Sequence, residues 1–570
     1  MIRQLQAITL CLLTTSAVAV AQQPHHSEVI VGHPGVTALK DDIRYLMSLA
    51  TAEERKQQQN IIDFVELLEL GLDLQRPLRV DLLTGTNPPG YIISAGYVDP
   101  VQDLLDNLDG SGFVLKKIDA SLSELLPPDT GWFRLLPGTK EAILVFTKPA
   151  DHMLLRQVIQ RMSEPLKAVA PVIAGNASIG IQLHNRQQTP ADQKLRRDSF
   201  GEIRAVEMDS LQQRPSETAT QFALRKKGVS VQLDEIERLL AEANSASAVI
   251  HLDRKAHHAT VTFKADAIAG SSFAKSMDEF GSHPDVFASV PRAEGSVLSV
   301  RGNYALDELR QKNGVETTQL MEQDAAARLA ANKTLSASEK AASEKLVKGL
   351  MQFTRDSIAS GAINGFAESI PNPKGDFTSW GAIAVKDGKK LNDLLALISE
   401  TGKGNVFKGN VATVGDVTIH QVQFAEGYFQ PFDLLFENKA GYIGVSDQII
   451  WIGTGGPESL EPMKAAIQNL KEPAAAETVL SIEGNLLMWS KRAKRLLEEA
   501  PPLKSADEQT KRRDRLRYLG TAVEAFATLD DARFTMTVKD GKAHGEIFVN
   551  RGVLTFIGRM LADYSKNHLE

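Results

Sequence analysis

Three histidines and an aspartate that could bind a metal lie close together near the middle of the chain: His251, Asp253, His257 and His258. If this stretch forms a β-hairpin, His251 and His258 fall on one face and His257 on the other, because side chains alternate along a strand. At most two imidazoles then converge, whereas a zinc site uses three or four protein ligands. We therefore keep His251 and His258 as the candidate metal ligands, but we favour an exposed hairpin edge and expect no cofactor.

A second candidate is the glycine-rich stretch Gly453-Thr454-Gly455-Gly456, which separates a predicted strand from a predicted helix. Loops at this position bind phosphate when their backbone N–H groups point at the ligand. This stretch lacks the Lys-Ser/Thr of a P-loop and the G-x-G-x-x-G spacing of a dinucleotide site. The corresponding stretch of the first half, residues 147–151, has no glycine. We therefore predict a structural turn.

The sequence also contains one fragment of a nucleophile motif, Ser272-x-x-Lys275. Penicillin-recognising enzymes with this pair also carry Ser-Asp-Asn and Lys-Thr-Gly. The chain has Ser446-Asp447-Gln448 but no Lys-Thr-Gly, and it has neither G-x-S-x-G nor H-E-x-x-H. No catalytic residue is therefore predicted. A carboxylate site assembled from distant residues stays open, because 71 acidic residues offer many spacings and only geometry selects among them.

The first 21 residues have the features of a secretory signal peptide. Arg3 provides the positive start, an apolar segment follows, and Ala19-Val20-Ala21 is a small-residue cleavage site. Cleavage removes the single cysteine, Cys11, which excludes thiol chemistry in the mature chain. The apolar segment is shorter than a membrane span. We therefore expect a periplasmic or secreted protein without a transmembrane segment after cleavage.

Length and charge limit the number of domains and the kind of partner. A chain of 570 residues exceeds one hydrophobic core, so about two to four domains are expected. The formal charge of −7 becomes −7 − 1 = −8 once Arg3 is removed. A negative protein binds polyanions poorly, so we expect no nucleic acid partner and no attraction to an anionic membrane surface. The expected partner is an envelope or extracellular ligand whose identity stays open.

Among the elements that would position these residues, the C-terminal hairpin has the clearest pattern. Residues 534–538 and 543–547 alternate apolar and polar side chains around Asp540-Gly541, a two-residue type I′ turn signal. The alternation gives one apolar and one polar face in a consistent register, with Thr537 opposite His544. The Asp-x-Lys-Ala-His and Val-Lys-Asp-Gly-Lys patterns of this hairpin recur from Asp253 and from Val385, which indicates internal repetition.

Short strands joined by tight turns, with helices inserted, favour an α+β fold with antiparallel sheets over a doubly wound parallel sheet. Two strand-and-helix units of the first half recur in the second: Asp103-Leu104-Leu105 matches Asp393-Leu394-Leu395, and Ile159-Gln160 matches Ile467-Gln468. We therefore predict duplicated units of antiparallel sheet packed with helices. A longer helical insertion is expected in the middle, at residues 304–369, which are rich in Ala, Glu and Lys. Within it, Ser336 and Glu339 have the spacing of a capping box, which predicts a helix start.

These repeats predict five segments: a signal peptide (1–21), an N-terminal tail and helix (22–75), a first α+β repeat half (76–280), a connecting sub-module with long charged helices (281–375) and a second α+β repeat half (376–570). Within the second segment we expect a flexible start at 22–38 and a helix at 40–72. If the halves are duplicates, residues 76–270 should superpose on residues 370–565.

Part of the chain has a layout seen in other proteins. It consists of Gly71-Leu72-Asp73, Arg76-Pro77-Leu78, the strand from Tyr91 to Ala95, then Asp99 and Leu104-Leu105. This layout resembles that of uncharacterised secreted bacterial proteins with a signal peptide and tandem α+β repeats. The resemblance covers most of the mature chain in layout and implies its location and architecture. It implies no activity, so no catalytic residue is carried over.

Three functions are compatible with these features. The first is a secreted or periplasmic, non-enzymatic binding or scaffold protein, which is favoured by repetition without a complete catalytic constellation. The second is a hydrolase acting on envelope material, which a cleft with two carboxyl groups of raised pKa would support. The third is a carrier of an apolar ligand, which a large apolar cavity would support.

Overall fold

A computed structural model describes the chain at residues 28–57, 71–83, 90–110, 113–126, 130–146, 152–173, 177–185, 189–214, 217–280, 282–372, 376–425, 440–500, 506–527 and 530–568. The predicted signal peptide, with Cys11, and residues 147–151 lie outside this part. The chain forms two compact units: unit 1 comprises residues 1–210, 233–274 and 546–570, and unit 2 comprises residues 211–232 and 275–545. In the described part, no helix combines the length and the hydropathy that a membrane span requires.

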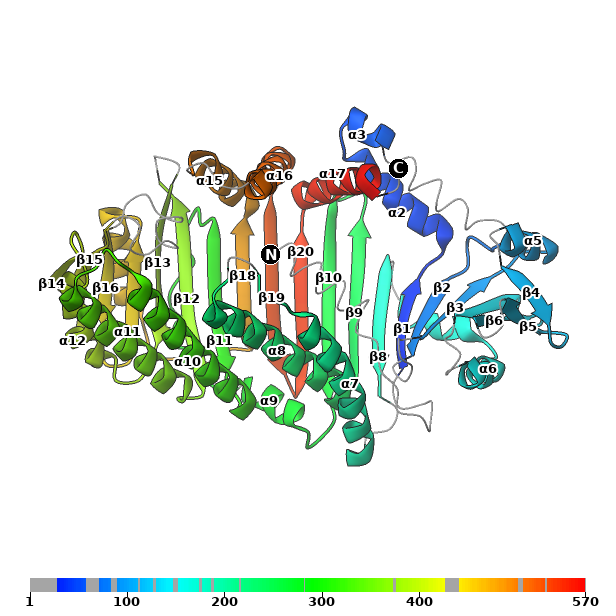
Figure 1. The fold of residues 1–570 in the computed structure, drawn as a ribbon, viewed down its shortest axis with the longest axis horizontal. Coiled ribbons are helices and arrows are strands. Elements are labelled where there is room, and N and C mark those ends of the chain that lie inside the picture. Colours follow the sequence, from blue (N-terminus) through cyan, green and yellow to red (C-terminus); the bar gives the residue numbers. More distant parts are fainter. Residues whose placement is uncertain are drawn as a thin grey trace. The chain divides into compact units, whose positions relative to one another are not determined.

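Unit 1 is built on an antiparallel sheet (Figure 1). In order of pairing its strands are β4 (Val114–Lys117), β5 (Leu122–Leu126), β6 (Gly131–Leu136), β7 (Glu141–Phe146), β3 (Gly90–Gly96), β2 (Leu78–Leu83), β1 (Glu28–His33), β8 (Ile179–His184), β9 (Ala243–Asp253) and β10 (His258–Ala267). Its helices are α2 (Val36–Ser48), α3 (Ala52–Gln57), α5 (Gln102–Gly110), α6 (His152–Arg161), the short η2 (Pro165–Val169), α7 (Pro190–Ser210), the second part of α8 (Ala219–Glu242) and α17 (Arg551–His568).

Unit 2 also has an antiparallel sheet. In order of pairing its strands are β14 (Val406–Val414), β15 (Val417–Gln423), β16 (Ala440–Val445), β17 (Ile449–Thr454), β13 (Phe377–Ala384), β12 (Ala362–Pro371), β11 (Leu298–Ala305), β18 (Thr478–Asn485) and β19 (Asp531–Lys539). Its helices are the first part of α8, most of α9 (Ser272–Phe280), α10 (Glu308–Ala331), α11 (Ala337–Ile358), η3 (Gly388–Lys390), α12 (Leu391–Ala396), η4 (Leu397–Glu400), η5 (Pro457–Ser459), α14 (Leu460–Asn469), α15 (Leu486–Glu499) and α16 (Ala506–Ala525). Strand β20 (Lys542–Val549) begins in unit 2 and ends in unit 1.

The α+β prediction is confirmed, but the beginning of the chain differs from it. Residues 28–33 form β1, which pairs with β2 and β8, where the sequence predicted a flexible start at 22–38. Both partners of β1 are distant in sequence, so local composition could not reveal this strand. In place of one helix over 40–72, α2 ends at Ser48 and α3 spans Ala52–Gln57, and residues 58–70 lie outside the described part.

Two local predictions are confirmed. The turn between β19 and β20 places Asp540 at φ 51° and Gly541 at φ 69°, and Thr537 Oγ1 lies 3.4 Å from His544 O. Ser336 and Glu339 cap the start of α11 reciprocally. The predicted middle insertion is the pair α10 and α11, but its predicted bounds include residues that belong to β11 and β12, and α7 and α8 form a pair of similar length.

The strands of the two halves of the sequence pair in the same order. The pairings β1–β2, β1–β8, β2–β3 and β3–β7 have counterparts in β11–β12, β11–β18, β12–β13 and β13–β17. The successive pairings from β4 to β7 and from β8 to β10 likewise match those from β14 to β17 and from β18 to β20. Each strand β1 to β10 therefore has a counterpart ten strands later.

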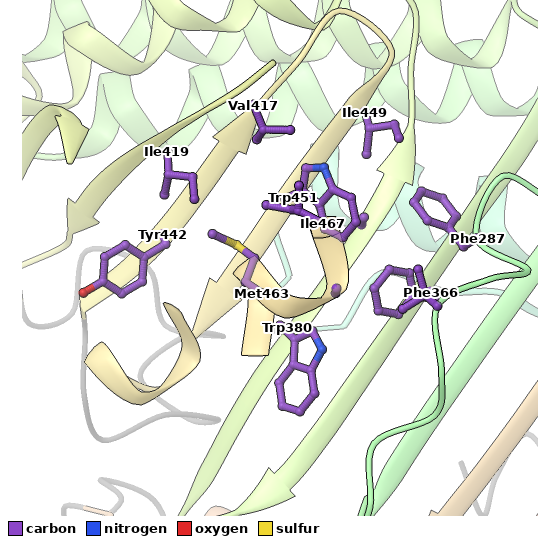
Figure 2. Close-up of a cluster of buried hydrophobic side chains, with 13 residues drawn as sticks. Phe287, Phe366, Trp380, Val417, Ile419, Tyr442, Ile449, Trp451, Met463 and Ile467 are labelled. Atoms are coloured by element: carbon purple, nitrogen blue, oxygen red, sulfur yellow. The ribbon is translucent and has the colours of Figure 1, made fainter. Parts of the chain in front are cut away.

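Figure 2 shows the core of unit 2, which lies between one face of its sheet and α14. Its centre is Trp451, which is fully buried and meets the rings of Phe287 and Phe366 edge-on at centroid distances of 6.0 Å each. Met463 of α14 is also fully buried in this cluster. The opposite face of the same sheet is covered only in part, and it carries the candidate site described below.

Candidate functional site

His251 and His258 share one face of the hairpin, as the sequence predicted, whereas His257 lies in the turn and not on the opposite strand face. In the β9–β10 register His258 is opposite Asp253 and Thr260 is opposite His251, which places His251, Asp253 and His258 on one face. His257 lies in the turn at φ 57°, and its Nδ1 is 2.9 Å from the Tyr45 hydroxyl. Across the described ranges, no group of three or more His, Cys, Asp or Glu residues could hold a metal ion. Among the residues that the structure describes, His251 and His258 therefore belong to no group that could hold a metal ion.

The glycine-rich loop after β17 packs against neighbouring strands. A Cβ on Gly455, at φ 90°, would lie 2.2 Å from Phe377 O, and Gly456 N donates to Ala440 O. These contacts require glycine for steric reasons and use backbone groups that a phosphate would need. They support the interpretation as a structural turn.

Ser272 of the Ser-x-x-Lys pair stands at the start of α9, where it donates to a buried carboxylate. Its Oγ is 2.8 Å from Glu242 Oε2, which also accepts from Phe273 N at 2.7 Å. Burial raises the pKa of Glu242, but these hydrogen bonds and the Arg197 guanidinium outweigh burial and hold the pKa below its ordinary value. Lys275 is exposed. Ser272 thus has a local role as a donor to Glu242.

Glu242→Gln is expected to lower the free energy of unfolding by about 1–3 kcal/mol at neutral pH, because a charged acceptor of several hydrogen bonds is lost. A carboxyl group whose pKa is lowered by folding adds stability above its unfolded pKa of about 4.3 and loses it as the pH falls through the folded pKa. The difference in the free energy of unfolding between the wild type and Glu242→Gln should therefore shrink below about pH 4. Urea unfolding at several pH values measures it, and a difference independent of pH would contradict the assignment.

One buried acid–base pair was not visible in the sequence. His152 Nε2 of α6 lies 3.2 Å from Glu124 Oε1 of β5, and the His152 ring stacks on Trp132 at 4.2 Å. Glu124 also faces Lys116, at 3.4 Å. Both residues are buried, and the side chains of His152 and Glu124 are only 4% and 11% exposed. A substrate could reach this pair only after the packing around Trp132 opened.

Two carboxyl groups, Glu237 and Asp530, have raised pKa values, and each has a structural partner. Burial raises the pKa of Glu237, although Arg204 Nη2 lies 2.9 Å away. Burial also raises the pKa of Asp530, which accepts from Leu487 N at 2.9 Å at the start of α15. Glu237 belongs to unit 1 and Asp530 to unit 2. Each carboxylate therefore has a local partner within its own unit.

A run of partly exposed apolar side chains crosses one face of the unit 2 sheet. Directly paired residues of antiparallel strands point to the same face. The register therefore aligns one row across β19, β18, β11, β12, β13 and β17, made of Phe534, Ile482, Val300, Ala367, Gly381 and Ile452. A second row lies two residues away on the first five strands, on the same side of the first row throughout. It consists of Met536, Leu480, Gly302, Gly365 and Ile383. We call the two rows the isoleucine strip.

The isoleucine strip combines exposure with the absence of charge. Ile452, Ile383 and Ile482 are 45%, 36% and 36% exposed, and Ala367 is also exposed. Neither row contains an ionisable or hydrogen-bonding side chain. Side chains of this kind normally face a covering layer, and contiguous exposed apolar surface marks a binding site.

The row from β19 to β17 continues through Ile443 of β16 to His420 of β15. His420 is buried, and its ring lies between Asn410 N, which donates to Nδ1 at 3.2 Å, and Asn392 Oδ1, 3.0 Å from Nε2. Burial lowers the pKa of His420. The neutral form of this ring adds no charge to the end of the row.

Helices contact the same sheet face near both ends of the strands, although Ile363, the next residue of this face on β12, is 41% exposed. Leu346 of α11 packs with Ile450 and Val445 next to the second row. At the other end of the strands, the Trp489 ring of α15 packs on Phe377 at a centroid distance of 4.2 Å. The two rows are about 7 Å apart, the spacing of two same-face residues along a strand, and they run about 24 Å across six strands. The isoleucine strip is too narrow for a standard protein interface, which buries about 800 Å² on each partner.

Unit 1 has a comparable row that is better covered. Its members, on β9, β8, β1, β2, β3 and β7, are Ala248, Ile181, Val31, Val80, Ile93 and Leu144. None of these side chains is exposed. Exposure of the row is therefore a property of unit 2, and it does not follow from the strand order alone.

Sequence reasoning missed the isoleucine strip because its residues come from six strands scattered from Val300 to Met536. Only the strand register brings them together. Comparison with protein-family models, with curated proteins and with solved structures gave no match for this chain.

Proposed function

We propose that this protein is a secreted or periplasmic, non-enzymatic binding protein, and that its isoleucine strip takes one extended apolar chain, such as the acyl chain of an envelope lipid. The observation that carries the proposal is the pair of uncharged rows with exposed isoleucines on one sheet face. Removal of an acyl chain from water contributes about 0.8 kcal/mol per buried CH₂ group. A strip without polar groups leaves no donor or acceptor unpaired when such a chain covers it.

The middle of the strip has room for a ligand. A Cβ added to Gly302 would meet only Leu480 Cδ1, at 3.9 Å. Gly381 differs, because a Cβ there would lie 2.3 Å from Phe366 O, so its backbone contact explains the glycine. The isoleucines flank these small residues on both sides, on β18 and on β13 and β17. This layout suits a slim chain better than a helix about 10 Å across.

We further infer that the chain arose by duplication of a ten-strand unit. The support is the matching order of strand pairing and the matching helix positions between paired strands. On this basis the sheet face is covered in the copy that forms most of unit 1, and the same face presents the ligand surface in the copy that forms most of unit 2. The predicted superposition of residues 76–270 on 370–565 tests the duplication.

Gly302→Phe is expected to lower the affinity for a fluorescent long-chain fatty acid at least tenfold. The new ring would occupy the space above β11 and displace at least two methylene groups, worth about 1.6 kcal/mol. Titration of the purified protein, followed by probe fluorescence, measures the change. Native mass spectrometry of protein isolated from its own envelope fraction would identify a lipid that copurifies.

Gly484→Phe is the matched control. Gly484 is equally open, with Leu298 Cδ1 at 3.9 Å, and it points to the same face from β18 but lies outside both rows. The affinity of the Gly484→Phe protein for the fluorescent fatty acid should stay within about twofold of the wild-type affinity. No binding by the wild type, or equal affinities for wild type and Gly302→Phe, would overturn the proposed site.

In the part of the chain that the structure describes, the pair His152 and Glu124 is the candidate site for the hydrolase hypothesis. This hypothesis is less well supported than binding, because both residues are buried against Trp132. Turnover of an envelope substrate that is lost in His152→Gln but kept in Gly302→Phe would favour it over the binding proposal.

A further inference from the structure

Each unit is completed by a helix from the other half of the sequence. Helix α17, the last element of the chain, belongs to unit 1, and most of α9, which follows β10, belongs to unit 2. The two helices are counterparts in the strand order, because α9 follows β10 as α17 follows β20. The exchange is thus reciprocal.

Helix α17 packs tightly on α2 and α3 (Figure 1). A Cβ on Gly558 would lie 2.2 Å from Leu46 O, so the two helix backbones are in close contact. Arg559 Nε donates to both carboxylate oxygens of Glu54 in α3, at 3.0 and 3.2 Å. Leu554 is buried. This contact combines apolar burial with a charged pair that is 13% and 24% exposed.

Helix α9 and the segment after it are equally integrated in unit 2. The Arg310 guanidinium of α10 lies over the Phe280 ring of α9 at 4.9 Å. Beyond α9, Asp285 and Ala474 exchange two backbone hydrogen bonds, of 2.8 and 3.1 Å. Phe287 is buried against Trp451 in the core. Residues that precede β11 therefore form part of the unit 2 core.

We propose that the two halves of the chain hold each other through these exchanged elements, and that the surface of α2 and α3 is a docking site for one partner, the amphipathic helix α17. The occupant is set by the close approach at Gly558 and by the Arg559–Glu54 pair. Covalent continuity between the halves is then unnecessary once the chain has folded. A chain cut between them stays one particle.

The test uses the full mature chain with a site-specific protease sequence inserted between Glu294 and Gly295. Both residues are exposed and a Cβ on Gly295 would meet nothing within 4 Å, so we expect the fold to accommodate the insertion. After cutting, size-exclusion chromatography with light scattering should show one particle containing both fragments. Separation of the fragments under native conditions would overturn the proposal.

A pair of variants isolates the role of α17. Gly558→Leu forces α17 away from α2, whereas Gly520→Leu adds the same side chain to α16, where a Cβ would meet nothing within 4 Å. The cut Gly558→Leu protein should separate into fragments at a clearly lower urea concentration than the cut Gly520→Leu protein. In addition, a cysteine placed at Leu554 should react with a thiol reagent at least tenfold faster in the Gly558→Leu background. Equal urea midpoints and equal reactivity would show that α17 does not join the halves.

Discussion

Trp451→Ala is expected to lower the free energy of unfolding of unit 2 by about 3–5 kcal/mol, the range for truncation of a buried Trp. Trp451 is fully buried between Phe287, Phe366 and Met463, which come from separate elements of the unit. A cavity at this point cannot close by movement of one element, because three different chain segments meet there (Figure 2). The loss should appear in calorimetry as a lower transition temperature for unit 2.

Trp451→Phe separates the loss of volume from the loss of the indole N–H. Trp451 Nε1 is buried and has no hydrogen-bond partner in the described part of the chain. Phenylalanine removes this unpaired donor and keeps most of the ring contacts, so the cost should stay below about 1.5 kcal/mol. A cost equal to that of Trp451→Ala would show that the indole nitrogen has a partner, and would contradict the packing argument.

Glu368→Ala is expected to destabilise unit 2 by about 3–5 kcal/mol, the range for breaking a buried ion pair. The Glu368 carboxylate is fully buried on β12 and accepts from Ser299 Oγ and Ser296 Oγ, at 2.8 Å each, and from Arg301 Nη2 at 3.2 Å. Its removal takes this acceptor away from Ser299 Oγ and Arg301 Nη2, whereas Ser296 Oγ keeps Leu298 O at 2.8 Å. Because the Arg301 side chain is 25% exposed, water can solvate it in part, and the lower end of the range is the better expectation.

Two further substitutions test this explanation by urea unfolding. Glu368→Gln keeps one acceptor oxygen and should cost about 1–2 kcal/mol. The double substitution Glu368→Met with Arg301→Met removes both charges and should recover much of the stability, because a buried ion pair replaced by apolar side chains is often neutral. If the double variant is as unstable as Glu368→Ala, the destabilisation comes from lost packing instead of from an uncompensated charge.

Features that depend on a few neighbouring residues could be predicted from the sequence. The turn at Asp540-Gly541 follows from the positive φ that both positions need, and it forms as expected. The cap of α11 follows from Ser336 and Glu339 three residues apart. The α+β class follows from the alternation of short strands with helices. These predictions succeed because their interactions are local.

Features that depend on strand order were missed or misplaced. Strand β1 was read as a flexible start, although it pairs with β2 and β8 on both sides. The pairing of His152 with Glu124 joins a helix to a strand across Trp132 and has no signal of local spacing. The isoleucine strip follows only when the register aligns strands that are far apart in the chain.

The sequence by itself determined the class of the fold, the hairpin turns and the helix caps, because backbone φ preferences and neighbouring side chains set these features within a few residues. Only the tertiary structure decided which face of the unit 2 sheet is covered. Helices α11 and α15 contact that face on either side of the two rows and leave Ile383, Ile452 and Ile482 accessible. It also decided that α17 completes unit 1. Packing energy depends on which distant surfaces meet. The alternation of apolar and polar residues along one strand does not identify those surfaces.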